Sequence, residues 1–342
     1  MVENKEDFEY VWIMNNNEPL EVNPQTKVVK RLSPNFYKYL ATSKYWVNNQ
    51  NFPKYIKKGK QNVYLQTWHG TPLKKMLNDL DHVVGRADDY LESVTRLAND
   101  WDYLISPSKY ATEKFKSAFK YENEIIETGY PRNDLFFDDN KNEKIKDIRN
   151  KLNIPEGKKV VLYAPTFRDN KKQNNRFTLD LQLDLEKMKA RLGNDYIVLV
   201  RLHVIVKNDL KISDELASFV INVSNYHDMQ ELLLLSDVLI TDYSSSMFDF
   251  ANTKKPMIFY TYDLEEYRDD IRGFYIDFEN EAPGPLVKNT EGVIKSLENI
   301  EEINKEYQEK YQQFSRKYCQ FEEGYATERV VNHVFDKKFR KG

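Results

Sequence analysis

Short runs of β-branched and aromatic residues alternate with helix-like segments along most of this chain. Such an alternation is typical of parallel sheets that are covered by helices on both faces. We therefore expect an α/β protein. The predicted strands are Tyr10–Met14, Asn62–Thr67, Tyr103–Ser106, Ile125–Thr128, Val160–Ala164, Tyr196–Arg201, Phe219–Asn222, Val238–Thr241 and Met257–Tyr260.

Helix signals lie between these strands. Ser33 followed by Pro34 predicts an N-cap with proline at the first helical position. Ser108 can cap a helix that runs to Phe119, and Met229–Leu235 predicts one or two apolar helical turns. The chain has 342 residues, and a domain holds roughly 150 residues, so about two domains are expected. The turn residues of 152–157 place the boundary between residues 1–152 and 153–306.

Composition excludes several classes of protein. The 51 basic and 54 acidic residues give a net charge of -3, which argues against a general nucleic-acid binder. One cysteine, Cys319, allows no internal disulfide and no multi-cysteine metal site, and fits a reducing cytoplasm. Apolar stretches such as Tyr196–Val200 are far shorter than the ~20 residues that cross a bilayer, and Met1–Asp7 does not read as a secretory signal.

Polar residues gather where the predicted strands end. In open parallel sheets, ligands bind beyond the carboxyl ends of the strands. Both halves of the chain contribute such residues, so a cleft between two domains is expected. The candidates are His69, Gly70, Thr71, Pro72 and Arg132 in the first half, and Pro165, Thr166, Arg201, Leu202, His203, Ser244, Ser245 and Ser246 in the second.

Each group has a chemical use and a plainer alternative. Ser244–Ser246 precede a predicted helix, so their hydroxyls and the helix N–H groups can hold a phosphate, although one serine could be a simple N-cap. Arg201 and His203 can bind a diphosphate, or they can be a surface arginine and a buried histidine. His69 can act as a base near neutral pH, and its alternative is a turn residue. Gly70 allows a close backbone approach to a ligand.

Other motifs are absent or weak. The sequence has no Gly-rich Lys-Ser/Thr phosphate loop and no Gly-x-Gly-x-x-Gly after a strand. These absences argue against an ATPase and against a dehydrogenase. Asp79-Leu80-Asp81 follows a helical segment, so it is interpreted as a solvated helix end, with His82 on the surface. His333 is expected to be structural, and no histidine–carboxylate spacing indicates a metal.

Five motifs together resemble the CDP-glycerol glycerophosphotransferase family. They occur in the order that the family shows and span roughly residues 9 to 335. Lys255, Pro256 and Tyr260 follow the last of them. The motifs are QTWHGTPLKK at 66–75, GYPRND at 129–134, YAPTFR at 163–168, RLH at 201–203 and ITDYSSSMFDF at 240–250.

The resemblance implies two Rossmann-like domains that face a cleft, the glycosyltransferase B arrangement, with helices of residues 307–342 packing back across the domains. It implies CDP-glycerol as the donor and a hydroxyl of a lipid-linked disaccharide or a growing poly(glycerol phosphate) chain as the acceptor. No cofactor and no metal are implied. His69 would be the base, and His203 with Arg201 would bind the diphosphate. Asp249 would reach the donor's hydroxyls.

The resemblance also implies the site's remaining contacts. Pro165 and Thr166 would line the nucleotide site with Arg132 nearby, Gly70, Thr71, Pro72 and Leu202 would belong to the donor site, and Ser244, Ser245 and Ser246 would hold phosphate. Phosphoryl transfer depends mainly on positioning and charge stabilisation, which this set of residues can supply.

The match begins near Phe8, so the family's first strand–helix unit is expected to be missing. Three alternatives stay open: a CDP-ribitol transferase or capsule polymerase of the same fold, a non-catalytic CDP-polyol binder, and a sugar-nucleotide glycosyltransferase. The basic clusters Lys54–Lys60 and Lys337–Lys341 could meet an anionic lipid surface at the inner face of the membrane, or they could be solvated basic faces.

Overall fold

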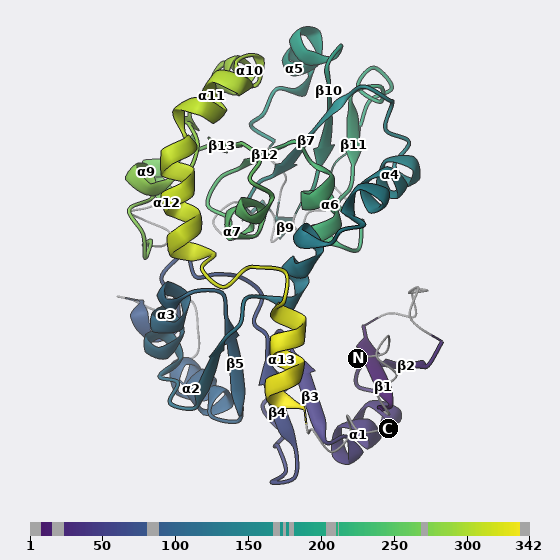
Figure 1. Cartoon of the computed structure of the whole chain (residues 1–342), viewed down its shortest axis with the longest axis vertical. Helices are drawn as coiled ribbons and strands as arrows, with labels where there is room; N and C mark the ends of the chain where they lie inside the picture. The colour runs from purple at the N-terminus through teal and green to yellow at the C-terminus, as the bar shows by residue number, and fades with distance from the viewer. Residues whose placement is uncertain are drawn as a thin grey trace.

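The computed structural model contains two separate parallel sheets, one above the other in Figure 1. The structure describes residues 8–15, 24–80, 89–166, 172–173, 176–177, 181–202, 210, 212–267 and 273–335. One sheet is built from the first half of the chain and the other from the second half, which is the arrangement expected of two Rossmann-like units. The boundaries at residues 152 and 306 stay a prediction.

The larger sheet has six parallel strands in the order β11-β10-β7-β12-β13-β14. In chain order this is 3-2-1-4-5-6, the doubly wound Rossmann topology, and the strand order reverses between β7 and β12. A ligand is therefore expected beyond the carboxyl ends of these two strands. The strands are β7 (Lys159–Ala164), β10 (Tyr196–Val200), β11 (Val220–Asn222), β12 (Val238–Thr241), β13 (Met257–Tyr260) and β14 (Leu286–Val287).

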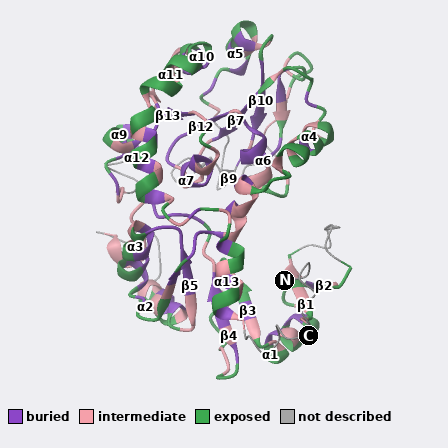
Figure 2. Cartoon of the chain, in the orientation of Figure 1, coloured by how far each residue is buried: buried purple, intermediate pink, exposed green. Residues whose placement is uncertain are grey.

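Alternating side chains of β7 enter two different cores. Val160 and Leu162 join the apolar cluster on one face of the sheet, and Val161 and Tyr163 join the cluster on the other face. Successive residues of a strand point to opposite sides, and a parallel sheet needs both faces covered. The central strands β10, β12 and β13 are accordingly buried throughout, and β7 is buried from Val160 onward (Figure 2). The helices of this half include α4 (Lys141–Lys151), α5 (Leu185–Leu192), α6 (Met229–Leu235), α7 (Ser246–Phe250) and α10 (Thr290–Glu298).

The smaller sheet has four parallel strands in chain order, β3-β4-β5-β6. Its core is rich in aromatic rings, and Trp101, Phe115 and Phe119 are fully buried there. Ser108 Oγ accepts from the Ala111 N–H, so the predicted cap of α3 is confirmed. The elements are β3 (Tyr45–Asn48), β4 (Val63–Gln66), β5 (Tyr103–Ser106), β6 (Glu124–Glu127), α2 (Tyr90–Ala98) and α3 (Lys109–Phe119).

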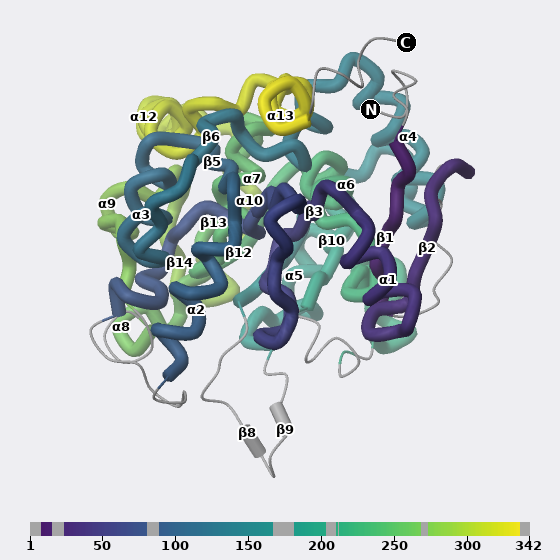
Figure 3. Tube along the Cα trace, turned by 90° about the horizontal axis from the view of Figure 1, so that it is seen from below, coloured from purple at the N-terminus to yellow at the C-terminus, as the bar shows by residue number. Residues whose placement is uncertain are grey.

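A separate pair of parallel strands, β1 (Tyr10–Met14) and β2 (Thr26–Lys30), stands beside α1 (Pro34–Thr42) (Figure 3). Ser33 Oγ accepts from the Phe36 N–H, which confirms the predicted cap of α1. Strands β2 and β3 were not predicted. β2 has only two apolar residues among polar and charged ones, whereas β3 was missed although it is as long as the predicted strand β5.

The remaining elements are short or lie near the C-terminus. They are η1 (Leu77–Asp79), η2 (Pro131–Phe137), η3 (Ala251–Thr253), β8 (Lys172–Gln173), β9 (Arg176–Phe177), α8 (Leu264–Glu266), α9 (Phe278–Glu281), α11 (Ile300–Glu306), α12 (Gln308–Tyr318) and α13 (Ala326–Val334). Within the described residues, no helix combines the length and the apolar character that a membrane crossing requires.

The last two helices join the two halves, as expected. On α12, the Phe314 ring stacks on Phe248 with a centroid separation of 5.3 Å, and Tyr318 meets Tyr110 of α3 edge-on at 4.7 Å. On α13, Val330 packs with Ile105 of the smaller sheet (Figure 1). The C-terminal segment therefore packs against both halves of the protein and links the two sheets.

Asp79 corrects one expectation. It was interpreted as a solvated helix end, but it accepts hydrogen bonds from Ser117 Oγ at 2.6 Å and from the Tyr275 hydroxyl at 2.5 Å. Tyr275 comes from the second half of the chain, so Asp79 helps to hold the two halves together. Asp81 and His82 lie outside the described residues. His333 pairs with Glu124 at 2.7 Å, in keeping with a structural role.

The Phe314 ring offers a test of this link. Replacing Phe314 by alanine removes a fully buried ring and leaves a cavity, so the free energy of unfolding should fall by about 3–5 kcal/mol. Urea denaturation measures it. Gln313→Ala, an exposed change on the same helix, should stay within about 0.5 kcal/mol of the native protein. Equal effects of the two changes would contradict this packing.

Candidate active site

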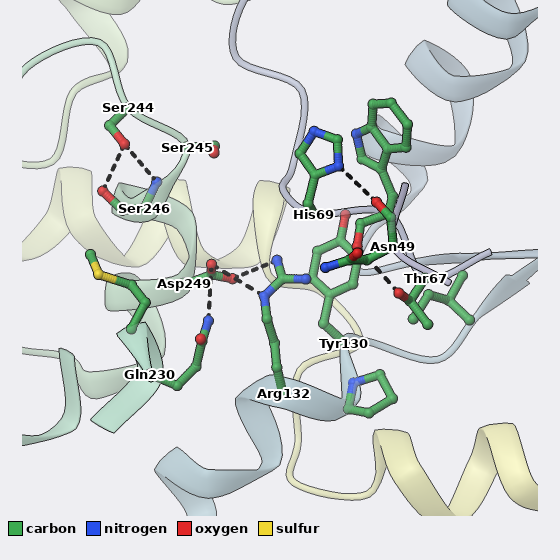
Figure 4. Close-up of a pocket in the computed structure, with 14 residues that line it drawn as sticks. Asn49, Thr67, His69, Tyr130, Arg132, Gln230, Ser244, Ser245, Ser246 and Asp249 are labelled. Atoms are coloured by element: carbon green, nitrogen blue, oxygen red, sulfur yellow. Dashed lines mark hydrogen bonds and ion pairs between the residues drawn. The ribbon is translucent and has the colours of Figure 1, made fainter. Parts of the chain in front are cut away.

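A cavity of about 490 Å³ lies between the two halves, and both halves line it (Figure 4). The first half supplies residues that follow β3, β4 and β6 and one residue of β5, Ile105. The second half supplies the start of α6 and the segment after β12. This is the cleft that the strand exits predict. Its lining residues are Asn49, Thr67, Trp68, His69, Ile105, Tyr130, Pro131, Arg132, Met229, Gln230, Ser244, Ser245, Ser246 and Asp249.

The loop after β4 is held in a strained turn. Trp68 has a φ of +51°, a left-handed conformation that a bulky side chain rarely adopts. Two contacts keep it there: the Trp68 N–H donates to Gln66 Oε1 at 2.9 Å, and the indole packs edge-on against Phe119 at 4.8 Å. Strain of this kind persists only where the surroundings fix it, and it is concentrated at functional sites. The turn presents the next residue, His69, to the cavity.

His69 is held in one tautomer. Its Nδ1 lies 2.9 Å from the backbone oxygen of Asn49. A carbonyl oxygen only accepts, so Nδ1 carries the proton and Nε2 keeps its lone pair. In Figure 4 the second ring nitrogen points away from Asn49. The imidazole is therefore oriented as a base.

The surroundings also keep His69 neutral. The residue is exposed at the cavity opening, but the surrounding protein displaces much of the water around its ring. This desolvation is the main cause that lowers the pKa of His69 below 6.5, and the positive charge of Arg132 lowers it further, against the bond to Asn49. At neutral pH the ring is uncharged and able to take a proton.

The close backbone approach at Gly70 is to Ser245 of the second half. A Cβ at this position would lie 2.6 Å from Ser245 Oγ and 3.1 Å from Ser245 Cβ. The backbone of the first half therefore touches the serine segment of the second half directly. Thr71 and Pro72 are buried and do not line the cavity, and the Tyr110 hydroxyl donates to Pro72 O at 2.6 Å. A donor-binding role for these three residues stays a prediction.

The chain after Pro72 is joined to the second half by backbone hydrogen bonds. Tyr275 N donates to Leu73 O at 2.9 Å, and Lys75 N donates to Gly273 O at 2.8 Å. These bonds flank an antiparallel bridge between Lys74 and Phe274. The His69 loop therefore continues directly into a segment that is attached to the opposite side of the cleft.

Arg132 and Asp249 form an ion pair across the cavity wall. Arg132 Nη2 lies 3.0 Å from Asp249 Oδ1, and its Nε lies 3.3 Å from Oδ2, so the pair is bidentate. The guanidinium also lies 3.9 Å from the Tyr130 ring centroid. Asn133 and Gln230 donate to the same carboxylate at 2.9 and 3.4 Å. Asp249 was expected to reach the donor's hydroxyls, but in this structure its oxygens serve the junction of the two halves.

The three serines all line the cavity (Figure 4). Ser244 Oγ accepts from both the Ser246 N–H at 3.3 Å and the Ser246 hydroxyl at 2.9 Å. Ser245 occupies the N-cap of α7, but its side chain makes no capping bond, so the simple N-cap alternative does not describe it. Three hydroxyls in one short segment can donate to an anion.

A buried carboxylate holds the two central strand ends together. Asp242 Oδ1 accepts from the Thr166 N–H at 2.8 Å and from the Tyr243 N–H at 2.7 Å, and Thr241 Oγ1 donates to Ala164 O at 2.7 Å. These bonds place Thr166 beside the segment that leads to the serines, at the point where the strand order reverses. Pro165 and Thr166 do not themselves line the cavity.

In the motif after β10, the described residues Arg201 and Leu202 make contacts with other groups of the protein. Arg201 Nη1 donates to Tyr226 O at 2.6 Å and to Val223 O at 3.3 Å. Burial is the main cause that lowers the pKa of Arg201. The Leu202 side chain lies in the core, and its N–H donates to Ser224 Oγ at 2.9 Å. Its place in the donor site stays a prediction. His203 lies outside the described residues, and its role stays a prediction.

Eight lining residues were not among the predicted site residues: Asn49, Thr67, Trp68, Ile105, Tyr130, Pro131, Met229 and Gln230. Four of them, Thr67, Trp68, Tyr130 and Pro131, lie inside the motifs at 66–75 and 129–134. Asn49 follows β3, a strand that the sequence pattern did not reveal. Gln230 opens α6 after Asp228, whose side chain caps the helix. Asp228 follows a predicted strand, so this helix start was the signal that could have found Gln230.

Comparison with known proteins agrees with this geometry. The family model described as CDP-Glycerol:Poly(glycerophosphate) glycerophosphotransferase matches residues 1–336. The chain belongs to this family. The cavity just described is therefore the candidate active site of a glycerophosphotransferase.

Two polymerases and one solved structure show how close the likeness is. A teichoic acid poly(glycerol phosphate) polymerase of Bacillus spizizenii is 44% identical over 89% of this chain and 79% of its own length. A protein of the same name from Bacillus subtilis is 43% identical over 98% of this chain, which spans 45% of the relative. The structure of the wall teichoic acid polymerase TagF aligns with a TM-score of 0.91 at 37% identity, over 99% of this chain and 84% of that one.

The contact between Gly70 and Ser245 predicts a loss of turnover that depends on Ser245. In this glycerophosphotransferase, Gly70→Ala places a methyl group against Ser245, so the His69 loop must shift. Turnover should fall by about 10- to 100-fold, because small misplacements of catalytic groups have effects of that size. Ser245→Gly removes the clash, but it also removes a hydroxyl of the proposed phosphate site, so this single variant is the reference. In the Ser245→Gly background, Gly70→Ala should cost little further turnover.

Steady-state turnover of the single and double variants measures this effect. Gly157→Ala also adds a methyl group, at a turn with a φ of +79° and nothing within 4 Å of the Cβ position. Gly157 does not line the cavity, so this change should strain the local backbone but leave turnover unchanged. Native turnover in Gly70→Ala would contradict the close contact.

Proposed function

We propose that this chain transfers glycerol phosphate from CDP-glycerol to a hydroxyl of a teichoic acid acceptor and releases CMP. The acceptor oxygen forms a bond to the phosphorus that carries glycerol, and the bond from that phosphorus to the CMP oxygen breaks. The acceptor's proton goes to His69 Nε2. This proposal rests mainly on the hydrogen bond from His69 Nδ1–H to Asn49 O. Because Nδ1 carries the proton, Nε2 is free to act as a neutral base in a cavity lined by both halves.

The charged and polar groups of the cavity suit an anionic donor. Arg132 supplies the positive charge near His69, and the hydroxyls of Ser244, Ser245 and Ser246 supply donors opposite it. In phosphoryl transfer the protein acts mainly by positioning and by stabilising charge, so groups of this kind are sufficient in principle. Arg201 and His203 are assigned to the diphosphate and the leaving CMP on the family pattern.

The acceptor is proposed to be a lipid-linked disaccharide or a growing poly(glycerol phosphate) chain. The family description and the polymerase relatives support poly(glycerol phosphate) as the product class. CDP-ribitol is the competing donor, because a site that holds a CDP-polyol through its phosphates does not read the polyol itself. A non-catalytic binder and a sugar-nucleotide glycosyltransferase are the competing functions, and an assay of turnover distinguishes each of them from a glycerophosphotransferase.

The decisive assay is CMP release from CDP-glycerol with a lipid-linked acceptor analogue. Native protein should release CMP with or without EDTA, and His69→Ala should lose about 10²- to 10⁴-fold in turnover, the usual contribution of a general base. His333→Ala, which removes a histidine paired with Glu124 far from the cavity, is the control and should behave as native.

The pH dependence follows from the lowered pKa of His69. The base works only when neutral, so the rate should be level near neutrality and should fall as the pH drops through a value below 6.5. If CDP-ribitol supports CMP release and CDP-glycerol does not, the donor is CDP-ribitol. Tight binding of CDP-glycerol without release would favour the non-catalytic binder.

Contact with an anionic membrane is also proposed, from the basic cluster at Lys54, Lys57, Lys58 and Lys60. Two of these four charges are already paired within the protein. Lys58 Nζ lies 2.6 and 2.7 Å from the two oxygens of Asp102, and Lys54 Nζ lies 3.5 Å from Asp89 Oδ2. Lys57 and Lys60 are exposed. The cluster Lys337–Lys341 lies outside the described residues.

Vesicle sedimentation at low salt tests this contact. Vesicles that contain anionic lipid should retain the native protein, and neutral vesicles should not. Lys57→Gln with Lys60→Gln should weaken retention by roughly 1 kcal/mol for each charge removed. Lys144→Gln with Lys146→Gln, an exposed pair on α4, is the matched control. Equal loss in both double variants, or no retention at all, would end the proposal.

A further inference from the structure

Glu322 is a buried carboxyl that the proposed reaction does not use. It lies between α12 and α13 and is 8% exposed, although glutamate is almost never buried without partners. The segment that carries it is fixed on both sides: Phe321 N donates to Pro107 O at 3.0 Å, and Arg329 Nη1 donates to Phe321 O at 3.1 Å. The position of this side chain is therefore set by the fold of the C-terminal segment.

The Glu322 side chain faces the loop between β6 and η2. Its Oε1 accepts from Asn133 Nδ2 at 2.9 Å and from Tyr130 N at 3.2 Å, and its Oε2 accepts from Tyr130 N at 3.2 Å. Gly129 makes room for this approach. It has a φ of +84°, and a Cβ there would lie 2.6 Å from Phe321 O and 3.0 Å from Glu322 Oε2.

These bonds continue into the cavity. Asn133 Nδ2 donates to Asp249 Oδ1 at 2.9 Å as well as to Glu322 Oε1, so one amide group joins two carboxyl groups. Asp249 in turn holds Arg132, which lines the cavity beside His69. Glu322 does not line the cavity, but it is one hydrogen bond from Tyr130 and two from Asp249, and both of these residues do.

We propose that Glu322 is a positioning residue for the donor site: by accepting from Asn133 and from the Tyr130 backbone, it holds Arg132 and Asp249 in the arrangement that receives the donor's phosphates. This inference rests on the proposed function. It adds a residue of the C-terminal segment to a site whose lining comes from the two sheets alone.

The charge on Glu322 gives the arrangement a pH dependence. The groups that face it are Arg132 and Tyr130 from η2 and its start, Asp249 from α7 and Cys319 from its own segment. Burial is the main cause that raises its pKa to about 8; Asp249 adds to the rise, and the bonds from Asn133 and Tyr130 N and the charge of Arg132 oppose it.

Glu322 is therefore mostly neutral at pH 7 and ionises as the pH rises through about 8. Above that pH a second negative charge lies beside Asp249, and a single guanidinium cannot neutralise both. An anionic donor should then bind less well.

The test compares Glu322→Ala with Glu322→Gln. Alanine removes both acceptor oxygens, so kcat/KM for CDP-glycerol should fall by about 10- to 100-fold, the scale of a small displacement of catalytic groups. Glutamine keeps an oxygen in the position that accepts from Asn133 and Tyr130, so it should retain most of the native kcat/KM at pH 7. Glu328→Gln, an exposed carboxyl on α13, is the control for a change of charge.

Two readouts separate positioning from a merely structural role. In an Arg132→Ala background, Glu322→Ala should cause little further loss, because contacting residues that act through one another are not additive. In the native protein, KM for CDP-glycerol should rise as the pH rises through about 8, the pKa of Glu322, and this rise should be absent in Glu322→Gln. The native pH profile needs no variant, so it stands even if Glu322→Ala does not fold.

Additive losses with Arg132→Ala, a native kcat/KM in a folded Glu322→Ala, or an alkaline rise in KM that persists in Glu322→Gln would each overturn the proposal. Failure of the proposed function is a separate result, since it is absence of CMP release by the native protein. In that case the same cycle and the same pH series are measured as dissociation constants for CDP-glycerol, or for CDP-ribitol if that donor binds in its place.

Discussion

The bidentate pair of Arg132 with Asp249 is the interaction on which the site depends. Arg132 comes from the loop after the smaller sheet, and Asp249 comes from the helix after the central strand of the larger one. Their charges meet at a partly buried wall, where their attraction offsets the cost of taking both charges out of water. Removal of one partner would leave a buried charge without compensation. Asn133 shares the carboxylate and links it to Glu322. One polar network thus connects both halves and the C-terminal segment.

The same junction explains how a proposed base in one half can act on a donor that is bound mainly by the other half. His69 belongs to the first half, whereas the serine segment and the strand-order reversal belong to the second. Gly70 touches Ser245, and the chain beyond Pro72 forms backbone hydrogen bonds with Gly273 and Tyr275. The proposed base is therefore placed relative to the proposed phosphate-binding serines by direct contact, which removes much of the freedom that reacting groups would otherwise lose on the way to the transition state.

Much of the fold could be predicted from the sequence. The strands Tyr103–Ser106, Val238–Thr241 and Met257–Tyr260 and the helix Met229–Leu235 have the bounds that the patterns indicate, because their apolar runs are bounded by clear turn and capping residues. The cleft followed from the rule that ligands bind at strand exits. His69, Arg132, Asp249 and the three serines line the cavity, whereas Gly70, Pro165 and Arg201 do not. The roles of all these residues stay predictions.

The sequence by itself determined the alternation of strands and helices, the residues at the strand exits and the family, because local patterns and ordered motifs are written along the chain. Only the tertiary structure decided what those residues do to one another. No local pattern shows that Asn49 O fixes the proton of His69, that Gly70 meets Ser245, or that Glu322 reaches Asn133 across 189 positions of sequence. Such contacts depend on how two sheets and a returning C-terminal segment pack, and that packing is a property of the whole chain.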